Sequence, residues 1–200
     1  MPTQFRPARA GDICILLLPD EDEMSRLNEH QRFLASHFGG QIHQAVHLTV
    51  QRFAPPPHSN LQPHSASLRG QASLILNLAD TLSHFSSLTF IALSSFSIYS
   101  NFKNSHIVKW EIAATDELRR YVALTDRALD EMGVSLSERY ADDWISTWVT
   151  ALDGVTNTAI TGEKIGVKYP QHLFTARRIW LSEIKEGNRY EVLAKADLRV

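Results

Sequence analysis

The chain has 200 residues, of which 44% are hydrophobic and 21% are charged, and its formal net charge is −2. This composition predicts a globular fold with one core or two small coupled lobes, and excludes disordered, collagen-like and coiled-coil proteins. The near-neutral charge provides no overall field for duplex DNA, although 20 Lys and Arg residues can still cluster locally. Cys14 is the only cysteine, which excludes an intramolecular disulfide and fits a reducing cytoplasm.

The first apolar segment covers residues 13–18 and is expected to be a buried strand, with Cys14 as a buried structural residue. It is too short and too acid-flanked for a signal peptide or a membrane span. Residues 1–10 are therefore interpreted as an N-terminal extension. Residues 11–200 are interpreted as a single domain of two lobes, and a monomer is favoured.

Apolar spacing and turn residues predict alternating helices and strands along the rest of the chain. The predicted helices cover residues 20–38, 71–84 and 115–132. The predicted strands cover residues 45–53, 88–99, 108–113, 144–152, 173–182 and 190–198, the last two forming a hairpin around residues 186–188. The segment 54–70 contains Pro, Ser and His without an apolar period, and is expected to be a surface loop.

One pattern occurs twice, as His47-Leu48-Thr49 in one predicted strand and Trp148-Val149-Thr150 in another. Alternate side chains of a strand share a face, so His47 and Thr49 project together. An imidazole moves protons near neutral pH, and a hydroxyl donates a hydrogen bond to a phosphate oxygen. Taken alone, a His-x-Thr sequence is more often structural than catalytic. The pseudo-repeat predicts that the two strands lie side by side.

The segment 45–53 resembles the first motif of the 2H phosphoesterases, which include 2'-5' RNA ligase-like proteins and 2',3'-cyclic nucleotide phosphodiesterases. The order of predicted elements resembles that family from residue 11 to residue 198. The resemblance implies an α+β fold, two-lobed and pseudo-symmetric, with antiparallel sheets flanked by helices around a central groove. It also implies acid–base catalysis by two histidines on a phosphodiester, with paired hydroxyls holding the phosphate, no metal and no cofactor.

The second motif departs from the family, because Trp148 stands where the second histidine is expected. Thr150 keeps the hydroxyl, so the resemblance assigns catalysis to His47, Thr49 and Thr150. An indole cannot shuttle protons, and losing one general acid or base typically costs about 10²–10⁴ in rate. Trp148 is instead expected to bind substrate, since aromatic side chains stack on bases in single-strand binding sites.

Further candidates supply positive charge or a substitute for the missing histidine. Arg52 and Arg177 are expected to bind substrate phosphate, with a solvated surface role as the alternative. His172 is the first candidate to replace the second histidine, because the final strands line the groove of the resembled fold. His43 and His106 are weaker candidates, with solvated or capping roles as the alternative.

Three functions remain open from the sequence. The first is a phosphoesterase acting on a 2',3'-cyclic phosphate, an RNA end or a small nucleotide, with activity weakened by Trp148. The second is an inactive protein that binds nucleotides or RNA ends. The third is a structural or interaction domain in which Trp148 fills the former site. The first two imply a phosphate-containing small molecule or RNA end as partner, and none implies a membrane.

Overall fold

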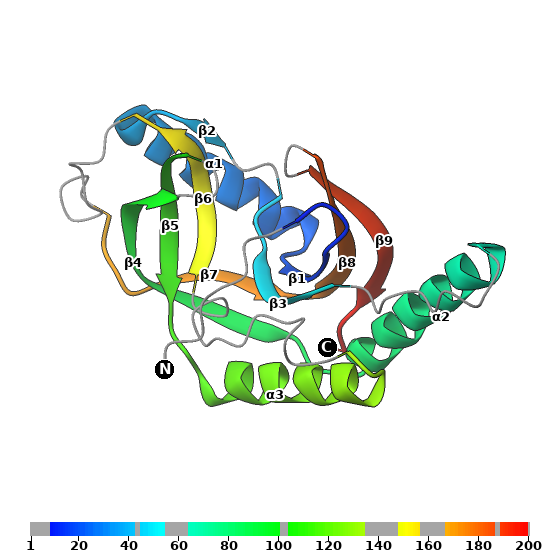
Figure 1. Ribbon diagram of the computed structural model, residues 1–200. Coiled ribbons are helices and arrows are strands. Elements are labelled where there is room, and N and C mark those ends of the chain that lie inside the picture. Colours follow the sequence, from blue (N-terminus) through cyan, green and yellow to red (C-terminus); the bar gives the residue numbers. More distant parts are fainter. Residues whose placement is uncertain are drawn as a thin grey trace, which may run out of the picture.

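The computed structural model describes residues 9–42, 45–54, 64–100, 104–134, 148–156, 167–186 and 189–199, without the side chains of 64–71 and Leu74. Within this part of the chain, three helices flank one nine-stranded sheet in which all paired strands are antiparallel (Figure 1). The helices are α1 (Glu21–Phe38), α2 (His64–Ser83) and α3 (Asp116–Glu131). The strands are β1 (Ile13–Leu18), β2 (Gln41–Ile42), β3 (Leu48–Phe53), β4 (Leu88–Ser100), β5 (Ser105–Ile112), β6 (Trp148–Val155), β7 (Gln171–Ala176), β8 (Arg178–Lys185) and β9 (Arg189–Asp197). No helix among these described residues is both long and apolar enough to cross a membrane.

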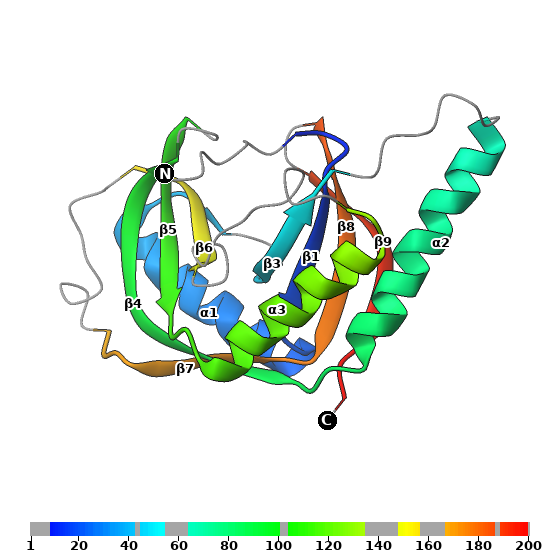
Figure 2. The same cartoon turned by 60° about the horizontal axis from the view of Figure 1, so that its bottom comes forward.

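The strand order is β7-β4-β5-β6-β3-β1-β8-β9, and β2 pairs with β6 outside this order. The sheet is curled, with β4, β5 and β6 in one lobe and β3, β1, β8 and β9 in the other (Figure 1). Figure 2 shows α2 and α3 beside the second group of strands, while α1 runs behind the first group. The central strands β3 and β6 therefore join the two lobes. This arrangement confirms the predicted α+β fold with antiparallel strands and flanking helices.

The helix α1 begins and ends at the residues that its sequence indicates. The Asp20 carboxylate caps it by accepting a hydrogen bond from the Glu23 backbone N–H at 2.9 Å. Gly39 follows its last turn with a φ of 72°, in the left-handed region that favours glycine. A Cβ at Gly39 would also lie 2.5 Å from the Thr156 hydroxyl, which would have to move, so the backbone conformation is the main reason for glycine there.

The two faces of the sheet differ in what covers them. On one face, buried residues of all three helices join a single core with alternating residues of the strands, including Leu48 and Val149. The opposite face, which we call the motif face, presents the intervening residues. They include a smaller apolar cluster around Leu16 and Trp180. In β3 and β6 the intervening residues include Thr49, Trp148 and Thr150.

The structure differs from the prediction in the bounds of two elements, the surface loop 54–70 and the strand 173–182. Residues 64–70 belong to α2 and not to the surface loop, and Gly70 lies within the helix, where one glycine costs only about 1 kcal/mol relative to alanine. The predicted strand 173–182 is two strands, β7 and β8. The chain turns at Arg177, whose backbone N–H donates to the Leu18 carbonyl as pairing changes from β4 to β1. This corner could not be read from a continuous apolar pattern.

Candidate functional site

The two motif strands lie side by side at the junction of the lobes. Leu48 of β3 pairs with Val149 of β6 in antiparallel register. Continuing that register by one residue in each direction places His47 beside Thr150, and Thr49 beside Trp148. The two motifs are thus related by a pseudo-twofold axis through the Leu48–Val149 pair. Trp148 occupies, by this symmetry, the position that corresponds to His47.

His47 lies just before β3 and is held in one orientation. Its Nδ1 atom is 2.7 Å from the Ala45 carbonyl oxygen, and only 8% of the residue is exposed. A carbonyl oxygen can only accept, so Nδ1 carries the proton and donates it to this hydrogen bond. The lone pair is then on Nε2. This is the tautomer that a general base needs.

Tyr190 of β9 also contacts the His47 ring, with ring centroids 5.3 Å apart in an edge-on arrangement. Although 41% of the Tyr190 residue is exposed, desolvation of its hydroxyl raises the pKa of that group above its ordinary value, with a further increase from Cys14, whereas Arg52 opposes the increase. A hydroxyl that stays protonated donates hydrogen bonds but does not take up protons from a substrate. Tyr190 therefore covers one side of His47 without competing with it as a base. The sequence offered no signal for this contact, because β9 is far from His47 along the chain.

The neighbouring strand β5 adds two charged residues that no sequence motif indicated. Lys109 pairs with Thr150, and Glu111 pairs with Trp148. Both are half-buried, whereas Trp110 between them is fully buried in the core. Lys109 therefore lies on the motif face next to a candidate phosphate-binding hydroxyl. The alternation of half-buried and buried residues along β5 could be predicted from the sequence. The residues of β6 that lie opposite them could not.

Arg52 on β3 and Cys14 on β1 also lie on the motif face. They are paired in the β1–β3 register, and both are buried. The Arg52 guanidinium lies 3.7 Å from the Asp12 carboxylate, which makes a structural ion pair. Burial raises the pKa of the Cys14 thiol to about 12, so it is not a nucleophile at neutral pH. The expected burial of Cys14 is confirmed, and a substrate-binding role for Arg52 remains a prediction.

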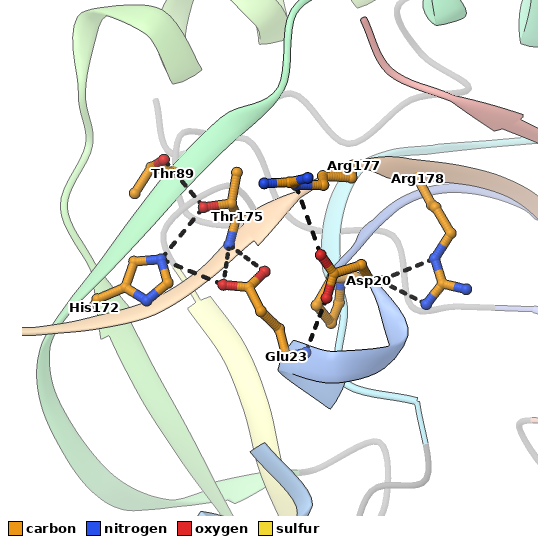
Figure 3. Close-up of polar contacts among 8 residues, drawn as sticks. Asp20, Glu23, Thr89, His172, Thr175, Arg177 and Arg178 are labelled. Atoms are coloured by element: carbon orange, nitrogen blue, oxygen red, sulfur yellow. Dashed lines mark hydrogen bonds and ion pairs between the residues drawn. The ribbon is translucent and has the colours of Figure 1, made fainter. Parts of the chain in front are cut away.

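His172 and Arg177 lie in a polar cluster at the start of α1 (Figure 3). The His172 Nε2 atom is 3.5 Å from the Glu23 carboxylate and 3.3 Å from the Thr175 hydroxyl. Arg177 pairs with Asp20 at 3.7 Å. In the sheet order, β4, β5 and β6 separate the strand of His172 from β3. The strand order therefore does not pair the strand of His172 with either motif strand, and substrate-binding roles for His172 and Arg177 remain predictions.

Glu23 links α1 to β7, and its removal is expected to destabilise the fold. Its carboxylate accepts the Thr175 backbone N–H at 2.9 and 3.2 Å and contacts His172. We expect Glu23→Gln to lower the free energy of unfolding by about 1–2 kcal/mol, because a charged acceptor for a part-buried N–H is lost. Urea unfolding would measure this change. Glu29→Gln on the exposed side of α1 is the matched control, and an equal effect of both variants would contradict the proposed link.

Of the remaining histidine candidates, His106 pairs with Val155 in the β5–β6 register, away from Thr150. His106 lies on β5, where its ring contacts Tyr99 with centroids 5.2 Å apart. His43 lies outside the described residues. Within the described residues, no group of three His, Cys, Asp or Glu side chains is placed to hold a metal ion.

No protein-family sequence profile and no curated protein sequence matches the chain. Solved structures do match over nearly its whole length. TT0787 of Thermus thermophilus is 15% identical with a TM-score of 0.59, and the match covers 94% of this chain and 98% of that one. A structure described as a phosphoesterase is 13% identical with a TM-score of 0.58, covering 95% and 99% of the two chains. E. coli LigT in its apo form is 11% identical with a TM-score of 0.56, covering 96% and 100%.

Proposed function

We propose a function from the fold that the chain shares with these phosphoesterase and LigT structures, the fold that the resemblance to the 2H phosphoesterases implied. In this proposal the chain binds the phosphate of a nucleotide or RNA end on the motif face and slowly hydrolyses 2',3'-cyclic phosphates. The observation that carries this proposal is the antiparallel pairing of Leu48 with Val149. Extended by one residue in each direction, this pairing puts His47 beside Thr150 and Thr49 beside Trp148 on one face of the sheet. E. coli LigT has been solved with phosphate and with 3'-AMP, which supports a phosphate ligand for this fold.

The proposed reaction begins at His47. Its Nε2 takes a proton from a water molecule while the water oxygen attacks phosphorus. The bond between phosphorus and one ribose oxygen breaks, and that oxygen takes up a proton. The hydroxyls of Thr49 and Thr150 donate to the non-bridging oxygens, and Lys109 offsets their negative charge. Trp148 cannot supply the proton to the ribose oxygen, so solvent supplies it and the step is slow.

Binding without hydrolysis is the second candidate function. It is favoured by Trp148 alone, because a site with one acid–base group and two hydroxyls can hold phosphate without turning it over. Measurable release of a 2'- or 3'-monophosphate from a 2',3'-cyclic nucleotide would distinguish the hydrolase from the binding protein. Chromatography of the reaction products detects both monophosphates.

Removing either hydroxyl is expected to weaken binding. Thr49→Val and Thr150→Val should each lower the affinity for a nucleoside 3'-monophosphate about tenfold or more, because each removes a hydrogen bond to a charged group. Isothermal titration calorimetry would measure the dissociation constants. Thr81→Val, on the exposed side of α2, is the matched control and should bind like the wild type. The proposal fails if neither nucleotides nor inorganic phosphate bind, or if binding survives both valine substitutions unchanged.

A further inference from the structure

The motif face continues beyond the two hydroxyls into an aromatic pair. The rings of Trp148 on β6 and Phe96 on β4 have centroids 4.5 Å apart with an interplanar angle of 85°. Both residues are half-buried. The β3–β6 register puts Trp148 on the same face as Thr49, and its half-buried indole has Phe96 packed edge-on against it. A partly exposed indole is a platform on which a planar base can stack.

A carboxylate lies directly beside this platform. Glu111 pairs with Trp148 across β5 and β6, and it pairs with Ser94 across β4 and β5. The Ser94 hydroxyl donates to Oε2 of Glu111 at 2.8 Å, which orients the carboxylate. A carboxylate can accept about four hydrogen bonds. Glu111 therefore retains capacity to accept from a ligand that is stacked on Trp148.

We infer that Trp148, Phe96 and Glu111 form a base-recognition subsite that prefers guanine. This inference rests on the proposed function, because the nucleotide phosphate is placed at Thr49. Guanine presents an N1–H and an exocyclic amino group side by side, and these two donors match the two acceptor oxygens of a carboxylate. Adenine presents the acceptor N1 beside its amino group, so one carboxylate oxygen would face a lone pair.

The spacing of the sheet agrees with this assignment. Adjacent strands are about 4.8 Å apart, so two strand steps from Thr49 to Glu111 cover about 10 Å. A nucleoside monophosphate extends over a comparable length from its phosphate to the far edge of its base. The Trp148 indole lies between these two positions. Lys109 pairs with Thr150, whereas Glu111 pairs with Trp148. Lys109 is therefore placed near the proposed phosphate position, and Glu111 near the proposed base position.

The test compares three nucleotides that are products and are not hydrolysed. Calorimetry with guanosine, inosine and adenosine 3'-monophosphates should rank guanosine tightest, by about tenfold or more over adenosine, with inosine between them. Inosine keeps N1–H and lacks the exocyclic amino group. Glu111→Gln should remove this preference, because an amide replaces one acceptor with a donor. Glu131→Gln, on exposed α3, should retain the wild-type ranking.

Inorganic phosphate separates failure of the inference from failure of the proposed function. Glu111→Gln should bind inorganic phosphate like the wild type, whereas Thr49→Val should bind it more weakly. Equal affinity of the wild type for all three nucleotides, with phosphate binding sensitive to Thr49→Val, would overturn the guanine subsite and leave the phosphate site in place. Absence of binding by every nucleotide and by phosphate would overturn both.

Discussion

Trp148→His is expected to raise the rate of 2',3'-cyclic nucleotide hydrolysis by about 10²–10⁴, the usual contribution of one positioned general acid or base. The β3–β6 register places residue 148 beside Thr49, just as His47 lies beside Thr150. An imidazole there would protonate the leaving ribose oxygen while His47 takes the proton of the attacking water. The gain corresponds to about 3–5 kcal/mol of transition-state stabilisation. Steady-state kinetics of the purified variant would measure it.

The control for this gain is Trp180→His, which introduces the same side chain elsewhere on the motif face. Trp180 lies on β8 and pairs with Leu16, so it is separated from β6 by β1 and β3. This variant should show no gain. Circular dichroism would establish that both variants are folded. A folded Trp148→His variant with unchanged turnover would contradict the assignment of residue 148 to the second catalytic position.

His47→Ala is expected to lower turnover by about 10²–10⁴, both in the wild type and in the Trp148→His background. In the Trp148→His background the expected rate is higher, so the loss of turnover caused by His47→Ala can be measured even if the wild-type rate is small. Affinity for nucleoside 3'-monophosphates should change much less, because the hydroxyls of Thr49 and Thr150 remain. A large effect on kcat with a small effect on binding is the pattern of a group that acts in the transition state.

His84→Ala is the matched control for the loss of His47. His84 is exposed after the end of α2, and its removal should leave turnover at the wild-type value. His47→Gln separates the effect of side-chain volume from the effect of proton transfer, since glutamine fills similar space without transferring a proton. If His47→Gln retained wild-type turnover, His47 would not be the general base.

The local sequence predicted most elements because each has a local physical cause. The apolar run of β1 is buried on both faces, and Asp20 and Thr115 cap the helices that follow them. In α3, Leu118 and Leu129 of the predicted apolar face are buried in the core. Such features depend on residues within a few positions of one another. They could therefore be read without knowing the rest of the fold.

Errors arose where distant strands determine the outcome. The turn at Arg177 exists because β7 pairs with β4 and β8 pairs with β1, although residues 173–182 carry one apolar pattern. His172 is predicted near the groove because the final strands line the groove of the resembled fold, and that role stays a prediction. Its contact with Glu23 of α1 joins residues far apart in the chain, so no local pattern indicated it. The register of β5 with β6 likewise revealed Lys109 and Glu111, which the sequence left unremarked.

The sequence by itself determined the two motifs, the polar character of their shared face and the replacement of one histidine by Trp148. These follow from residue identity and from the two-residue alternation of a strand. Only the tertiary structure decided what lies across from each motif residue, because strand register is set by burial of the whole sheet. The register pairs Leu48 with Val149, the central residues of the two motifs, and places Glu111 beside Trp148. The functional question therefore depends on a pairing between residues that are far apart in the chain.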